Sequence, residues 1–99
     1  MYCALTVRKL KPGTFEDFKT NFLPDDENPP EGWVRFDMIR GVENPDEVIC
    51  FGFFDGTLEQ LRGSYDGYDE QMDRIAPYVE SVGTDGIFEV VEERELATS

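Results

Sequence analysis

Two short segments of the sequence resemble each other, and each stands where a strand-like pattern gives way to a helix-like one. Residues 13–19 read GTFEDFK, and residues 56–62 read GTLEQLR. Both place a glycine and a threonine ahead of apolar residues spaced three apart, which is typical of a helix start with one buried side. The chain is therefore expected to consist of two halves that each run strand, helix, strand.

Four segments alternate between apolar and other residues, which is the period of a β-strand. They span residues 2–10, 33–42, 48–55 and 87–91. The turn at residues 43–46 (ENPD) is short, so the second and third strands are expected to form a hairpin. The register that gathers the apolar side chains on one face pairs Val34 with Phe53, Phe36 with Phe51 and Met38 with Ile49.

Helical spacing occurs twice. Thr14 can cap a first helix, and this helix has a buried stripe of phenylalanines, namely Phe15, Phe18 and Phe22. Thr57 with Gln60 repeats the capping arrangement ahead of apolar residues at steps of three and four between residues 58 and 79. Glycine and proline interrupt this second segment at Gly63, Gly67 and Pro77, so one helix and a helix in two pieces both stay open. Residues 81–86 are expected to be a loop.

Strands and helices in this order predict one α+β domain over residues 1–99. Two interleaved right-handed βαβ units give a ferredoxin-like βαββαβ fold, with an antiparallel sheet of order 4-1-3-2 and both helices on one face. The helix-covered face is expected to carry Cys3, Leu5, Val7, Val34, Phe36, Met38, Ile49, Phe51, Phe53, Phe88 and Val90. The reverse face is expected to carry Ala4, Trp33, Ile39, Val48, Cys50, Phe54, Ile87 and Val91.

That reverse face is too apolar for a monomer, which seldom leaves more than a few hundred Å² of contiguous apolar surface in water. Two copies packed sheet to sheet would cover it in one self-complementary step. The sequence therefore predicts a homodimer with a barrel between the subunits, that is, a dimeric α/β barrel.

Charge and composition exclude several classes of function. The formal charge is −13, which disfavours nucleic acid and anionic membrane surfaces as partners. There is no histidine, so Ser-His relays, His-ligated haem and two-His metal sites cannot form. Cys3 and Cys50 lie in strand-like runs and are expected to be reduced thiols. We expect a cytoplasmic protein without cofactor or metal.

Four further segments carry a family resemblance: residues 44–47 (NPDE), 53–55 (FFD), 57–64 and 75–79 (IAPYV). The chain resembles the dimeric α/β-barrel group that includes antibiotic biosynthesis monooxygenase-like domains. The resemblance implies a small pocket between sheet and helices. In enzymatic members it implies cofactor-free oxidation of an aromatic polyketide, or haem breakdown. Haem-degrading members use a histidine that this chain lacks, and Phe54 stands where many members have tryptophan.

Without histidine, polar contacts to a ligand would come from other side chains. The candidates are Trp33, Arg35, Tyr65 and Tyr68. Tryptophan can stack on a flat ligand, arginine can steady an enolate, and a phenol can hydrogen-bond a carbonyl. The alternative is that both tyrosines are core residues. A set of charged residues is expected on the reverse face, either pairing across the dimer or binding a charged ligand: Arg8, Arg35, Asp37 and Glu89.

Three functions stay open from the sequence. The chain could bind a small apolar or aromatic ligand, act as a cofactor-free monooxygenase on an aromatic polyketide-like substrate, or serve as a non-catalytic structural or sensing dimer. The first two need an open pocket between sheet and helices, and the third does not.

Overall fold

The chain folds into a four-stranded sheet with its helices packed on one side. The computed structural model describes residues 1–22, 31–64, 68–94 and 96. Its elements in chain order are β1 (Tyr2–Leu10), α1 (Phe15–Phe22), β2 (Trp33–Arg40), β3 (Glu47–Phe54), α2 (Leu58–Gly63), α3 (Tyr68–Ile75), the 3₁₀ helix η1 (Ala76–Tyr78) and β4 (Val79–Glu89).

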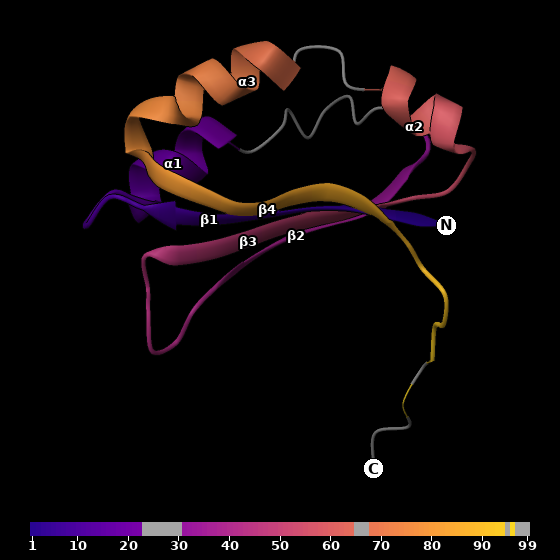
Figure 1. The fold of residues 1–99 in the computed structure, drawn as a ribbon, viewed down its shortest axis with the longest axis horizontal. Coiled ribbons are helices and arrows are strands. Elements are labelled where there is room, and N and C mark those ends of the chain that lie inside the picture. Colours follow the sequence, from indigo (N-terminus) through magenta and orange to yellow (C-terminus); the bar gives the residue numbers. More distant parts are fainter. Residues whose placement is uncertain (23–30, 65–67, 95, 97–99) are drawn as a thin grey trace.

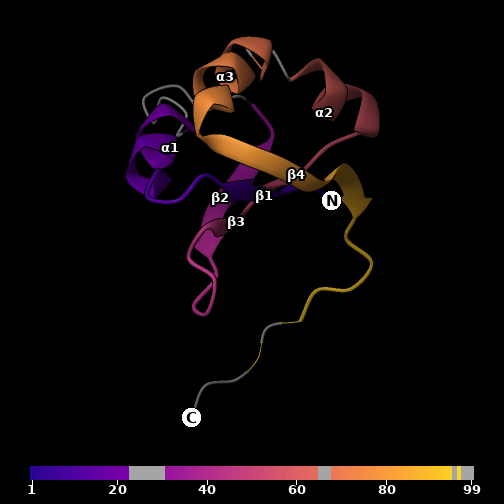
Figure 2. The same cartoon turned by 60° about the vertical axis from the view of Figure 1, so that its left-hand side comes forward.

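The sheet has the predicted strand order. Its strands lie in the order β2-β3-β1-β4, and each neighbouring pair is antiparallel. Helices α1, α2 and α3 all lie on the same side of this sheet, and no described helix lies on the other side (Figure 1, Figure 2). The ferredoxin-like fold with helices on one face is therefore confirmed.

The first helix has the predicted buried stripe. Phe18 and Phe22 are buried, and their rings stack with centroids 5.3 Å apart. The hydroxyl of Thr14 has a different use from the predicted one. It lies 2.7 Å from the carbonyl oxygen of Lys11 and 3.2 Å from that of Tyr78, and it can donate to either. Thr14 thus ties the start of α1 to the end of η1.

The second helical segment is divided into pieces. Thr57 caps α2 as predicted, since its hydroxyl accepts from the amide of Gln60 at 3.1 Å and the Gln60 side chain accepts from the amide of Thr57 at 2.9 Å. This helix ends at Gly63, and α3 begins at Tyr68. Pro77 lies in the first turn of η1, where its missing N–H is tolerated. Of the two alternatives that the sequence left open, the divided helix is the one observed.

The last strand is longer than predicted. It begins at Val79 and includes residues 81–86, for which the sequence predicts a loop. It pairs with β1 over its whole length, with shifts of register after Val7 and Lys9. As an edge strand, β4 is exposed along most of its length. Its residues therefore need not alternate between apolar and polar, and a strand could not be predicted from periodicity.

The register of the β2–β3 hairpin differs from the predicted one by a single residue. Phe36 lies opposite Gly52, and Met38 lies opposite Cys50. Side chains alternate along a strand, so a slip of one residue moves every side chain of β3 to the other face relative to β2. The predicted pairs of Phe36 with Phe51 and of Met38 with Ile49 are wrong.

The helices consequently cover the opposite face of β1 and β3 from the predicted one. On the covered face, Leu10, Val48, Cys50 and Phe54 are buried. The pairing places the following residues on the uncovered face: Cys3, Leu5, Val7, Ile39, Ile49, Phe51, Phe53 and Phe88. Both faces of these strands are apolar, so alternation indicated a strand without indicating which face the helices cover.

Candidate ligand site

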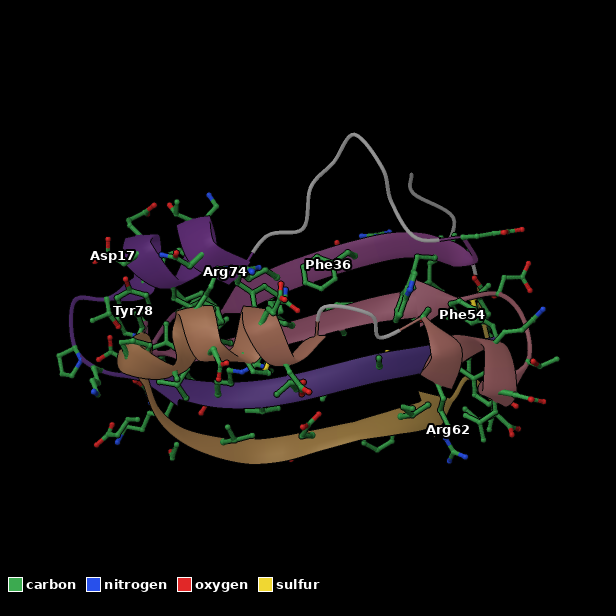
Figure 3. The ribbon with its side chains drawn as sticks, turned by 90° about the horizontal axis from the view of Figure 1, so that it is seen from above. Asp17, Phe36, Phe54, Arg62, Arg74 and Tyr78 are labelled. Carbon is green, nitrogen blue, oxygen red and sulfur yellow. The ribbon has the colours of Figure 1, made fainter. Side chains whose placement is uncertain are left out.

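A group of buried apolar residues holds α1 and α3 to the covered face. It consists of Leu10, Phe18, Phe22, Val48, Cys50 and Ile75. Phe54 and Leu61 are also buried but do not belong to this group. Seen from the helix side, Phe54 lies beside α2, and Phe36 lies on β2 between the two ends of the sheet (Figure 3).

Small residues occupy the covered face between this group and Phe54. They are Ala4, Thr6 and Gly52, on the central strands β1 and β3. A side chain at Gly52 is excluded, because a Cβ atom there would come within 2.9 Å of the ring of Trp33. Phe36, on the same face, keeps 40% of its surface exposed. Accessible aromatic surface therefore adjoins the part of the sheet that carries small residues.

Trp33 lies on the covered face, although the sequence predicts it on the reverse one. A shift of register between Trp33 and Arg35 changes the face of the first residue of β2. The indole nitrogen donates to the hydroxyl of Ser64 at 3.2 Å, and the indole ring meets Phe54 edge to face with centroids 5.3 Å apart. A hydrogen bond to Ser64, the residue that follows α2, and an aromatic contact thus fix the ring over Gly52.

Arg35 lies on the other side of the sheet. It pairs with Phe53, and its guanidinium forms a two-pronged ion pair with Asp37, with Nε 2.7 Å from Oδ2. The carboxylate of Asp37 raises the pKa of Arg35 by hydrogen bonding and charge. Trp33 and Arg35 were predicted to act together, and the structure places them on opposite faces.

The two tyrosines of the predicted site are not placed by the structure. Tyr65 lies outside the described residues. Tyr68 opens α3, but its side chain also lies outside what is described. Their participation in a site stays a prediction.

The covered face contains a charged residue that was predicted on the reverse face. Arg8 is 3% exposed and is the only buried charged residue among those described. Its guanidinium carbon lies 5.1 Å from the ring centre of Phe22 and 5.9 Å from that of Phe18. One terminal nitrogen, Nη2, donates to the sulfur of Met72 at 3.5 Å. The other, Nη1, has no hydrogen-bond partner in the described part of the chain.

These contacts do not compensate for the burial of the charge. A cation–π contact contributes about 0.5–2 kcal/mol, and a thioether is a weak acceptor. Burying an ion without a counter-ion costs several kcal/mol even after the protein relaxes. Among the described residues, no carboxylate forms an ion pair with this buried cation.

The thiol of Cys50 cannot neutralise Arg8. Burial raises the pKa of Cys50 to about 11, and the nearby guanidinium of Arg8 only partly opposes that rise. The thiol is therefore neutral at physiological pH. Among the described residues, no group of three or more Cys, Asp or Glu side chains could hold a metal ion.

The sequence shows that Arg8 is unusual, but the prediction placed it on the wrong face of the sheet. In β1 it is a cation one residue after Val7 and two before Leu10, in an otherwise mostly apolar strand. The prediction grouped it with Arg35, Asp37 and Glu89 on the reverse face, where these charges could pair. Because the faces of β1 are exchanged, Arg8 is instead separated from Arg35 and Asp37 by the sheet.

Solved structures with the same fold span almost the whole chain. A candidate antibiotic biosynthesis monooxygenase from Chloroflexus aurantiacus superposes with a TM-score of 0.75 at 11% identity, covering 97% of this chain and 98% of that one. A similar protein from Nitrosomonas europaea gives 0.74 at 17% identity, covering 93% and 100%. SnoaB from Streptomyces nogalater, a cofactor-independent oxygenase, gives 0.63 at 12% identity, covering 93% and 94%.

At these identities the likeness establishes the fold. No family model matches the sequence, and no curated protein matches it. Within the described ranges, no helix is long and apolar enough to cross a bilayer.

Proposed function

We propose that this chain, which has the ferredoxin-like fold of antibiotic biosynthesis monooxygenase-like proteins, binds a small flat apolar or aromatic molecule between its sheet and its helices. The observation that carries this proposal is the small-residue part of the covered face, bordered by aromatic rings. Ala4 and Thr6 have short side chains there, the ring of Trp33 covers the neighbouring Gly52, and Phe36 stands beside them. Ligand sites of this kind are mostly apolar with a few placed polar groups.

Trp33 has the clearest proposed role. Its ring is held by Ser64 and Phe54 before any ligand arrives, so stacking a flat molecule on it would cost little conformational entropy. Tyr65 and Tyr68 are retained as predicted contacts to a polar group of the ligand. Arg35 is not retained, because it faces the other side of the sheet.

The proposal is tested by filling the space above Ala4 with a larger side chain. Trp33 is the only tryptophan, so its fluorescence reports on this site alone. A neutral flat ketone, 2-acetylnaphthalene, should quench it with saturation. Ala4→Leu adds three carbons over the middle of the sheet and should weaken this binding by about tenfold or more, since each displaced contact carbon is worth about 0.8 kcal/mol.

Ala4→Ser is the matched control, since it keeps the residue small and should bind the ketone like the original chain. Equal affinity in Ala4→Leu and Ala4→Ser would place the ligand elsewhere. An absence of saturable quenching by any flat ketone or quinol tried would favour the remaining reading, a structural or sensing dimer without a small ligand.

A second candidate function is cofactor-independent oxidation of an aromatic polyketide-like substrate. The structural likeness to SnoaB, a cofactor-independent oxygenase, supports it. Oxygen uptake with 1,8-dihydroxyanthrone, measured with an oxygen electrode and compared between the original chain and Ala4→Leu, separates this function from ligand binding alone. Uptake above the uncatalysed rate that Ala4→Leu lowers would support oxidation at this site.

We further propose that two copies pack through their uncovered sheet faces. Eight apolar side chains gather there, and Ile39 and Phe88 are among the exposed large hydrophobic residues. Correcting the faces makes this surface more apolar than the predicted one, because Phe51 and Phe53 now belong to it. The two free cysteines accord with a reducing, cytoplasmic location.

A further inference from the structure

We infer that Arg8 anchors a negatively charged oxygen of the bound molecule, so that the ligand is a flat aromatic anion such as a carboxylate or a phenolate. This inference rests on the proposed function, because the anionic oxygen and the flat body would belong to one ligand. It adds the chemical class of the ligand and the residue that selects it.

The first support is the missing counter-charge. Arg8 is 3% exposed, and arginine side chains stay charged at physiological pH. Its contacts among the described residues are two phenylalanine rings, the Met72 sulfur and the neutral thiol of Cys50, none of which carries a negative charge. The carboxylate of Asp85, which stands opposite Thr6 on β4, accepts from the Thr6 hydroxyl, and no ion pair among the described residues joins it to Arg8. An anionic ligand would supply a counter-charge and so lower the free-energy cost of keeping this cation buried.

The second support is the hydrogen-bonding edge that remains free. The rings of Phe18 and Phe22 lie within 6 Å of the guanidinium carbon, Nη2 donates to the thioether of Met72, and the thiol of Cys50 is also within hydrogen-bonding reach of the guanidinium. Nη1 has no acceptor among the described residues. A planar guanidinium matches the two oxygens of a carboxylate, or a single phenolate oxygen, better than it matches a spherical ion.

The third support is the position of Arg8 relative to the proposed site. Thr6 and Arg8 are alternate residues of β1, so both lie on the covered face, one pleat apart. A flat body over Ala4 and Thr6 would thus place a terminal oxygen near Arg8. The formal charge of −13 repels free anions from the surface, so affinity must come from apolar contacts made by the rest of the ligand.

A pair of ligands of equal shape tests the inference. 2-Naphthoate carries a carboxylate where 2-acetylnaphthalene carries a neutral acetyl group. Binding to the full chain is measured by quenching of Trp33. The original chain should prefer naphthoate by about tenfold or more, the value of a charge-assisted hydrogen bond in a buried site.

Arg8→Met removes the charge and keeps an apolar side chain of comparable length. It should lose the preference for naphthoate, while its affinity for 2-acetylnaphthalene should stay within about threefold of the original. Arg62→Met is the matched control, since Arg62 is exposed on α2 and its removal changes the net charge equally (Figure 3). This control should keep the preference.

The thermal stability of the ligand-free protein gives a second, independent measurement. If Arg8 is a buried cation without a partner, Arg8→Met should raise Tm by roughly 3–8 °C. An arginine kept for structure would give a lower Tm, or no folded protein, on the same substitution, and either result would overturn the inference.

The remaining outcomes separate the inference from the proposal on which it rests. Equal binding of the two ligands by the original chain overturns the anion anchor and leaves the flat-ligand site standing. Binding of neither ligand overturns both. Displacement of naphthoate by millimolar inorganic phosphate would show a site for small anions and would overturn the requirement for an aromatic body.

Discussion

Cys50 lies beside Arg8 on the covered face, and its burial governs its ionisation. The buried thiol has a pKa raised to about 11 from an ordinary value of 9.0, chiefly because burial disfavours the thiolate. Between these two pH values the unfolded chain releases the proton and the folded chain keeps it. Folding stability from this group is therefore complete below pH 9 and is lost as the pH rises toward 11.

This difference predicts an alkaline loss of stability that belongs to Cys50. Over about two pH units the loss should reach roughly 2–3 kcal/mol, at 1.36 kcal/mol per unit. The free energy of unfolding in urea is measured at several pH values from 8 to 11 for the original chain and for Cys50→Ala. The substituted chain starts less stable because of the cavity, but its stability should fall less steeply with pH. Parallel curves would show that another group titrates.

At the scale of residues, the sequence named candidate ligand contacts but did not predict the face of the sheet on which each would lie. It singled out Trp33, and the structure holds this ring firmly on the covered face. It named Arg8 as a possible contact to a charged ligand but placed it on the wrong face, because a charge in a strand with two apolar faces carries no indication of which face it will join. It also joined Arg35 to Trp33, and a single shift of register between them sends these side chains to opposite sides.

Among the helices, α2 depends most on its cap. It has six residues, and a helix of this length is not stable by itself in water. The reciprocal hydrogen bonds between Thr57 and Gln60 satisfy two amides that would otherwise lack partners at its start. Since Ser64, whose hydroxyl holds the Trp33 indole, directly follows α2, we expect the cap to act on the proposed site as well as on the helix.

Thr57→Ala should therefore cost about 1 kcal/mol of folding stability, the usual value of a lost cap. Its effect should extend to Trp33, whose fluorescence anisotropy in the folded protein should fall as the indole gains freedom. Thr20→Ala on α1 is the matched control, because Thr20 is exposed and alanine is favoured within a helix. Equal stability of the two variants would mean that the cap contributes nothing to the fold.

At the scale of elements, local patterns predicted what they can encode. Caps, the phenylalanine stripe of α1 and the order of strands and helices follow from spacing over a few residues, and all were found except the use of the Thr14 hydroxyl. The length of β4 and the covered face of β1 and β3 depend on partners far away in the chain. Alternation of 180° per residue is the same for both faces, so no local pattern could choose between them.

The corrected faces change the expectation for the whole molecule. On the covered side, the centre of the sheet carries small residues, the buried cation Arg8 and, at the edge strand opposite Thr6, the carboxylate of Asp85. On the uncovered side, the central strands carry Leu5, Val7, Ile49, Phe51 and Phe53, a continuous apolar surface. Residues 90–94 also leave the sheet toward the uncovered side (Figure 1). The two sides thus have different proposed uses, ligand binding and association.

The association is tested at Phe51, in the middle of β3, whose side chain is central to the uncovered face. Phe51→Lys would place a charge in the middle of a sheet-to-sheet contact, where a copy related by two-fold symmetry brings the same charge opposite or nearby. The original chain should sediment as a dimer at micromolar concentration, and this variant should sediment as a monomer.

Thr20→Lys, which changes the charge equally on an exposed part of α1 on the opposite side of the sheet, should stay dimeric. Because a lysine on an unpaired surface is harmless to a monomer, the variant should keep its folded circular dichroism spectrum. An original chain that sediments as a monomer would mean that water covers this face, against the usual limit on exposed apolar surface.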